Sequence, residues 1–212
     1  MKFGPKKLAA ILWCGVVIAM ASVIGAGPWR RGAWRTPERL AILGAVPAFQ
    51  FHDQDDQPVT HASLRGSVWV ADFIFTQCAG PCPLMTVKMA ALQKSLPPQA
   101  KFVSFSLDPE HDTPAALKRY AHIFSADESR WKFLTGDQEA IMAQARGMLL
   151  AALPATFNQP IIHDGRFVLI DGQGRVRGAY LSNDPQSLAD LNRDARRLVA
   201  EDAPSRPLDA PQ

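Results

Sequence analysis

Two cysteines, Cys78 and Cys82, have the residue type and the spacing for metal or redox chemistry. They stand in the loop Cys-Ala-Gly-Pro-Cys-Pro, between a long apolar run and a predicted helix. Pro83 suits a first helical turn, where a missing N–H costs nothing, and the free N–H groups of that turn stabilise a thiolate. A thiolate is both the nucleophile of disulfide exchange and a soft ligand that selects Cu(I). The pair therefore predicts a functional site.

Three residues separate the two cysteines, whereas redox pairs of the common thioredoxin type have two. The extra residue gives the sulfurs more freedom to spread around a metal ion. A plain disulfide is the structural alternative, but closing so small a loop stabilises a fold only weakly. The third cysteine, Cys14, lies in the apolar N-terminal run.

Two thiolates leave a soft metal ion under-coordinated, so a third ligand is expected. The candidates are the histidines His52, His61, His111, His122 and His163. His111 and His122 flank a predicted surface helix. His163 lies in a loop that leads into a predicted strand, beside the cysteine loop if the fold is of the thioredoxin type. Without a motif, a surface or capping role is the ordinary interpretation of any single histidine.

Predicted strands and helices place the cysteine loop at a sheet edge. Strands are expected over residues 67–75, 101–108 and 131–136, with a hairpin over 166–180, and short strands flank a polar turn at 53–57. Helices are expected over 84–96, 113–124, 137–150 and 184–200. This order predicts an α/β fold with a mixed sheet.

Cys78 and Asp108 follow carboxyl ends of strands, where open α/β sheets form sites. Asp108 could tune a metal ion from outside its ligand shell, whereas Asp112 could equally support the helix start at Thr113.

The composition predicts one globular domain behind a membrane anchor. The chain has 212 residues, 47% of them hydrophobic and 20% charged, and a net charge of +3. We expect a cytoplasmic N-terminus over 1–7, a transmembrane anchor over 8–27, a linker over 28–45, the domain over 46–200 and a disordered tail over 201–212. The uncharged run of about 20 residues is long enough to span a bilayer. The main alternative is a cleaved signal peptide, whose apolar region is usually shorter, about 7–15 residues. The sequence has no cluster of basic residues of the kind that would predict nucleic-acid binding.

Three stretches carry a family resemblance: DFIFTQCAGPCPLMT, FVSFSLDPEHDTPAALKRYA and IIHDGRFVLIDGQGRV. Together they resemble the Sco/SenC family of copper-binding cytochrome c oxidase assembly proteins, over roughly residues 47–200. The resemblance implies a thioredoxin-like fold, with helices flanking a mixed sheet, behind one N-terminal transmembrane helix. It also implies that Cys78, Cys82 and His163 bind one copper ion per chain, and that Asp108 and Asp112 belong to an acidic motif near the metal.

By the same resemblance, the chain is a metallochaperone that delivers copper to, or assists assembly of, the binuclear copper site of cytochrome c oxidase. Its implied partners are the copper-site subunit of the oxidase, another copper chaperone or thioredoxin-like reductant, and the membrane. The absence of an Arg- and Ser-rich transit segment favours a bacterial inner membrane, with the domain in the periplasm.

Other chemistries use the same residues. The main alternative is a thiol–disulfide oxidoreductase, in which Cys78 and Cys82 are the redox thiols that reduce target cysteines before metal loading. A peroxiredoxin-like peroxidase is disfavoured because Thr76 stands two rather than three positions before Cys78, and Asp72 stands where a proline is expected. The ligand types also suit zinc with a bound water; the resemblance favours copper.

Overall fold

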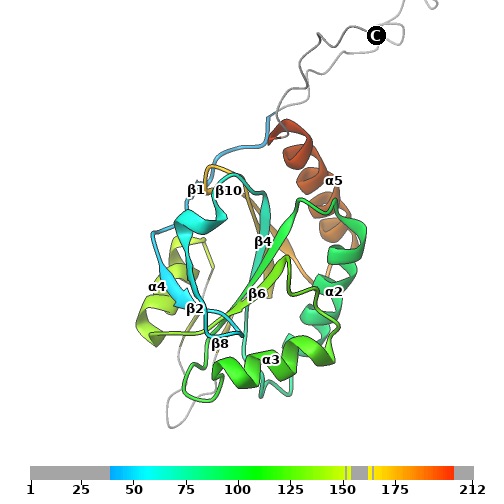
Figure 1. Cartoon of the computed structure of the whole chain (residues 1–212). Coiled ribbons are helices and arrows are strands. Elements are labelled where there is room, and N and C mark those ends of the chain that lie inside the picture. Colours follow the sequence, from blue (N-terminus) through cyan, green and yellow to red (C-terminus); the bar gives the residue numbers. More distant parts are fainter. Residues whose placement is uncertain (1–38, 151, 154–161, 164, 203–212) are drawn as a thin grey trace, which may run out of the picture. The chain divides into compact units, whose positions relative to one another are not determined.

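A mixed sheet of six strands forms the centre of the protein (Figure 1). The computed structural model describes residues 39–150, 152–153, 162–163 and 165–202. The strands lie in the order β1-β10-β9-β4-β5-β6. Their bounds are β1 Gly44–Ala45, β4 Trp69–Ile74, β5 Lys101–Ser106, β6 Trp131–Leu134, β9 Arg166–Ile170 and β10 Arg175–Leu181. β4, β5 and β6 are parallel, whereas β9 runs antiparallel to β4. The predicted mixed sheet is confirmed.

Helices cover both faces of this sheet (Figure 1). One face packs against α2 (Cys82–Ser95), α3 (Pro114–Ile123) and α5 (Pro185–Asp202). The other packs against α4 (Gln138–Gly147) and the short 3₁₀ helix η2 (His61–Leu64). Successive side chains of a strand point to opposite faces. Val70 and Ile74 of β4 therefore join the first core, and Ala71 and Phe73 join the second.

Two helices begin where the sequence predicts. Thr113 accepts a hydrogen bond from the N–H of Ala116, and Asp137 accepts one from the N–H of Ala140, as N-cap side chains do. Several other boundaries differ by a few residues from the prediction, and three of the differences bear on the site or the domain limits. α2 already begins at Cys82, α5 continues to Asp202, and β1 lies inside the stretch predicted to be a linker.

A hairpin covers the outer edge of β6. Its strands are β2 (Gln50–His52) and β3 (Pro58–Thr60). His52 and Thr135 exchange main-chain hydrogen bonds of 3.0 and 2.9 Å. The buried amide of Gln54 accepts from the N–H of Phe133 at 2.9 Å and donates to the carbonyl of Trp131 at 3.3 Å. The side chain of Gln54 thus takes the place of a neighbouring strand.

The predicted anchor over 8–27 and Cys14 lie outside the described residues. Within the part of the chain that is described, no helix is long and apolar enough to cross a membrane.

Candidate metal and thiol site

Cys78 lies in the loop that connects β4 to α2, and Cys82 is the first residue of α2. Cys78 is half-buried in the loop, Cys82 is fully buried at the first position of α2, and neither forms a disulfide bond. The N–H of Cys78 donates to the carbonyl of Phe75 at 3.2 Å, and the N–H of Gly80 lies 3.4 Å from the sulfur of Cys78. The loop therefore folds back around the more exposed sulfur.

The two thiols differ in environment. Burial raises the pKa of the Cys82 thiol well above its usual range, and the neighbouring Cys78 raises it further. This is opposite to what the position at a helix start leads one to expect, because desolvation disfavours the charged form more than the helix end favours it. Cys82 is therefore a thiol in the free protein, and it needs a metal ion or a proton acceptor to ionise.

Asp112 ties the cysteine loop to the loop after β5. Its carboxylate, fully buried, accepts hydrogen bonds from the N–H of Thr76 at 3.1 Å, the hydroxyl of Thr76 at 2.5 Å and the hydroxyl of Ser106 at 2.6 Å. Thr76 stands two residues before Cys78. Asp112 thus faces the cysteine loop, while the helix start at Thr113 is capped by Thr113 itself.

Asp108 lies nearer the surface of the same loop. Both of its carboxylate oxygens are 3.0 Å from Nδ1 of the exposed His111, and this contact raises the pKa of His111. Asp108 therefore bonds to His111, whereas Asp112 is the acidic residue that contacts the cysteine loop.

The main chain of His163 lies at the same end of the sheet as the cysteines. His163 belongs to β8 (Ile162–His163), which pairs with β7 (Ala152–Leu153) just before β9. Since β9 runs antiparallel to β4, the start of β9 lies beside the end of β4. Two hydrogen bonds connect this region to α2. The Lys88 ammonium donates to the carbonyl of Ser182 at 2.7 Å, and the N–H of Ser182 donates to the carbonyl of Gly165 at 2.9 Å.

The structure describes the main chain of His163 but not its imidazole, so its role as a ligand stays a prediction. Among the side chains that the structure does describe, no three His, Cys, Asp or Glu gather closely enough to hold a metal ion. Met85 and Met89 are buried in the core under α2, as expected for methionines at helical spacing.

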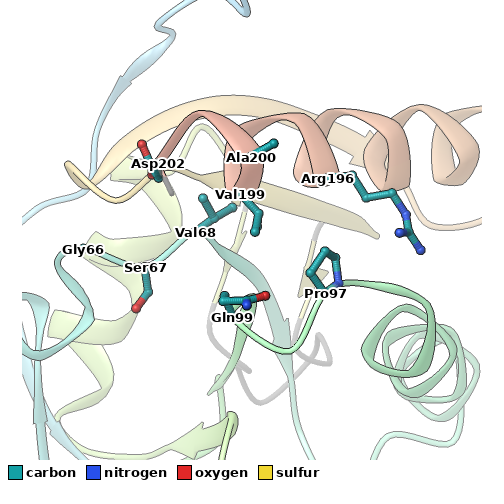
Figure 2. A pocket seen from close by; sticks show the side chains of 9 residues that line it. All are labelled: Gly66, Ser67, Val68, Pro97, Gln99, Arg196, Val199, Ala200 and Asp202. Carbon is teal, nitrogen blue, oxygen red and sulfur yellow. The ribbon is translucent and has the colours of Figure 1, made fainter. Parts of the chain in front are cut away.

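A pocket of about 400 Å³ lies at the other end of β4 (Figure 2). The end of α5, the loop before β5 and the segment before β4 line it, including Val68, Pro97, Arg196 and Val199. It is remote in the fold from the cysteine loop, because Val68 precedes β4 and the cysteines follow it. The pocket is therefore separate from the thiol site.

One buried polar group, in the core under α2, was not predicted from the sequence. Asp72 of β4 is fully buried, and neither of its carboxylate oxygens has a hydrogen-bond partner. Burial raises the pKa of Asp72 to about 7, and the nearby Ser104 hydroxyl of β5 offsets this only in part. The signal in the sequence was a single charged residue inside the apolar run SVWVADFIF.

The mixed sheet and the dithiol loop at its edge define a thioredoxin-like domain with a two-cysteine site. The sequence profile of the SCO1/SenC family matches residues 43–199, and the chain belongs to this family. It is 37% identical over 143 residues to the SCO1 protein homologue of Bacillus subtilis, an alignment that covers 64% of this chain and 72% of the relative.

Two solved structures agree with this assignment. BsSco, described as a member of the Sco family of cytochrome c oxidase assembly proteins with a disulfide switch, is 34% identical with a TM-score of 0.68, over 76% of this chain and 96% of that one. ScoI of Bradyrhizobium japonicum, solved with copper bound, is 25% identical with a TM-score of 0.59, over 71% and 99% of the two chains. The likeness to copper-bound relatives supports a copper-related role for this chain.

Proposed function

We propose that this chain is a membrane-anchored protein that binds one copper ion and delivers it to, or assists assembly of, the binuclear copper site of cytochrome c oxidase. Copper is its cargo. The observation that carries the proposal is the pair Cys78 and Cys82, which form no disulfide where β4 leads into α2. The segment that follows His163 is hydrogen-bonded to the same helix through Lys88 and Ser182. Membership of the Sco family and the copper bound to ScoI support it.

The chemistry of the proposed ligands suits a cargo site. Cys78 and Cys82 would supply two thiolates and His163 one imidazole, which are soft and borderline ligands of the kind that Cu(I) prefers. Three ligands leave one side of the ion open to an incoming ligand. Cys78, the more exposed thiol, would be the first to meet an acceptor, and Asp112 would hold the loop in place.

The test is a Cu(I) titration of the reduced, purified chain against a competing chelator. Wild type is expected to bind one copper ion, and His163→Ala to bind it at least about tenfold more weakly, as expected when a metal ligand or its support is lost. His122→Ala, which removes an exposed histidine of α3, is the matched control and should bind as wild type does. Equal affinity of wild type and His163→Ala would remove His163 from the site.

A second candidate function is thiol–disulfide exchange on the cysteines of the target. The difference in burial between the two thiols favours it, because a half-exposed Cys78 can attack a target disulfide and a buried Cys82 can resolve the mixed disulfide. This function needs both cysteines but not His163. A His163→Ala chain that restores full oxidase activity in cells would favour it over copper delivery.

The location follows from the predicted anchor. We infer one transmembrane helix over residues 8–27, with the domain on the periplasmic side of a bacterial inner membrane. There it would meet the copper-site subunit of the oxidase and a copper donor or reductant.

A further inference from the structure

α2 carries an apolar surface on the side that faces solvent. The helix packs on one face of the sheet (Figure 1), and its inward residues, among them Met85 and Met89, are buried. Its outward residues are apolar as well, since Leu84 is 58% exposed and Val87 is 52% exposed. A helix at the surface of a soluble domain normally turns charged and polar residues outward. The outward face of α2 therefore needs an explanation.

Charge is almost absent from this face, in contrast to the neighbouring helices on the same side of the sheet. α3 exposes Lys118 and Arg119, and α5 exposes Arg193. The first three turns of α2 contain one charged residue, Lys88, and its ammonium group donates to the carbonyl of Ser182 at 2.7 Å. Apart from this engaged group, the first three turns of α2 present no charge to a partner.

The apolar face of α2 continues into the loop that carries Cys78. Because residues three positions apart are neighbours on a helix surface, Leu84 lies between Val87 and Pro81, the residue that precedes α2. Pro81 and Ala79 are exposed, and both belong to the loop that follows Cys78. Single exposed leucines are ordinary on protein surfaces, whereas a contiguous apolar patch indicates a site of interaction. This patch begins beside the sulfur that has to meet a partner.

We propose that the patch formed by Ala79, Pro81, Leu84 and Val87 is the surface on which the protein that receives copper or electrons docks. The partner that fits is a folded protein with an uncharged, apolar surface around its own metal-binding or disulfide cysteines. Contact at the patch places those sulfurs next to Cys78. Association then depends on buried apolar area and not on ion pairs. This inference rests on the proposed function, which requires that a partner reach Cys78.

A second copy of this chain is the other occupant that an apolar patch could take. Symmetric contact through the patch would bring two Cys78 loops together and keep both from an acceptor. A chain that hands copper or electrons to another protein has to leave this surface open, so the acceptor is the occupant that fits the proposed function.

The test is the affinity of the reduced, metal-free full-length chain for the isolated copper-site domain of the oxidase subunit from the same organism, measured by isothermal titration calorimetry. Leu84→Gln combined with Val87→Gln replaces the exposed apolar side chains by a good helix former. The double variant should bind the domain about 10–100-fold more weakly, as expected when central apolar contacts of an interface are lost. The affinity of wild type should change less than about threefold between about 50 mM and about 500 mM salt, because no ion pair is screened.

Ile123→Gln is the matched control, because Ile123 is 72% exposed and lies in the last turn of α3, outside the patch. It should bind the domain as wild type does. The inference is overturned if wild type does not bind the domain, or if the double variant binds it within twofold of wild type. It is also overturned if sedimentation shows a dimeric wild type and a monomeric double variant, because the patch then joins two copies of the chain. The Cu(I) titration judges copper binding separately, since the docking measurement uses metal-free protein and the double variant keeps every proposed ligand.

Discussion

At the scale of single residues, two buried carboxyl groups stand near the cysteines in contrasting surroundings. Asp112 is satisfied by the main chain and hydroxyl of Thr76 and by the hydroxyl of Ser106. Asp72 lies in the core with no hydrogen-bond partner. Asp112 therefore stabilises the site, whereas Asp72 destabilises the fold around it, and their replacements should act in opposite directions.

Asp112→Ala is expected to lower the free energy of unfolding by about 3 kcal/mol or more, because it leaves the donors of the half-buried Thr76 and the buried Ser106 without their charged acceptor. It should also weaken copper binding, since the cysteine loop loses its attachment. Urea denaturation and the copper titration measure the two effects. Asp137→Ala, which removes only the cap of α4, is the control and should cost about 1 kcal/mol without changing copper affinity. If Asp112→Ala lowers the free energy of unfolding and the copper affinity no more than Asp137→Ala does, Asp112 does not hold the cysteine loop in place.

Asp72 makes stability fall as the pH rises. Its folded-state pKa of about 7 lies above the usual aspartate pKa of 3.8, so between these pH values the folded chain holds a proton that the unfolded chain has lost. The stabilising protonated form is fully present below pH 4 and is lost through pH 7, a decrease on the order of 4 kcal/mol. Urea denaturation from pH 4 to pH 8 should show this component in wild type but not in Asp72→Asn. Identical pH profiles for the two chains would refute it.

At the scale of elements, α2 is attached to the segment that follows His163. The hydrogen bond from Lys88 to Ser182, and that from Ser182 to Gly165, join the helix that carries Cys82 to the start of β9. If His163 is the third ligand, this attachment sets its position relative to the two sulfurs.

Lys88→Met should therefore weaken copper binding several-fold, because the hydrogen-bond donor to Ser182 is lost. Both thiols should stay reactive, because methionine keeps the apolar packing of the lysine side chain. The measurement is the competition titration with Cu(I), together with thiol counting. Lys94→Met, on the exposed end of the same helix, is the matched control. Equal affinities for Lys88→Met and wild type would show that the attachment does not position a ligand.

Much of the fold was accessible from local sequence patterns. The run SVWVADFIF predicted β4, and Thr113 and Asp137 marked the starts of α3 and α4, because these signals act within a few residues. β1 was missed because Gly44–Ala45 has no strand preference of its own and pairs only through tertiary contact with β10. For the site, the cysteine spacing was informative, but the partners of Asp112 and the isolation of Asp72 depend on packing between distant segments.

At the scale of the whole molecule, the reactive groups gather at the end of the sheet where the parallel strands have their carboxyl ends. The cysteine loop follows β4 and the acidic loop follows β5, and these strands are parallel, so their carboxyl ends meet. The pocket beside Val68 lies at the opposite edge (Figure 2). A partner that exchanges copper or electrons with Cys78 must approach the end of the sheet formed by the carboxyl ends of β4 and β5.

Removal of residues 1–27 is expected to transfer the protein from the membrane fraction to the soluble fraction, because the proposed anchor is the apolar run over 8–27. Alkaline extraction of membranes followed by immunoblotting measures this. Removal of 203–212 is the control and should leave membrane association unchanged. Membrane association that survives loss of 1–27 would exclude this segment as the anchor.

The hairpin beside β6 has a consequence for the behaviour of the protein at high concentration. An uncovered edge strand offers free N–H and carbonyl groups that recruit further copies of a chain into intermolecular sheets. In this protein the amide of Gln54 occupies those groups at Trp131 and Phe133, and His52 occupies those of Thr135. At high concentration the protein is thus protected from self-association along the β6 side of its sheet, while the end that carries the thiols stays open to other proteins.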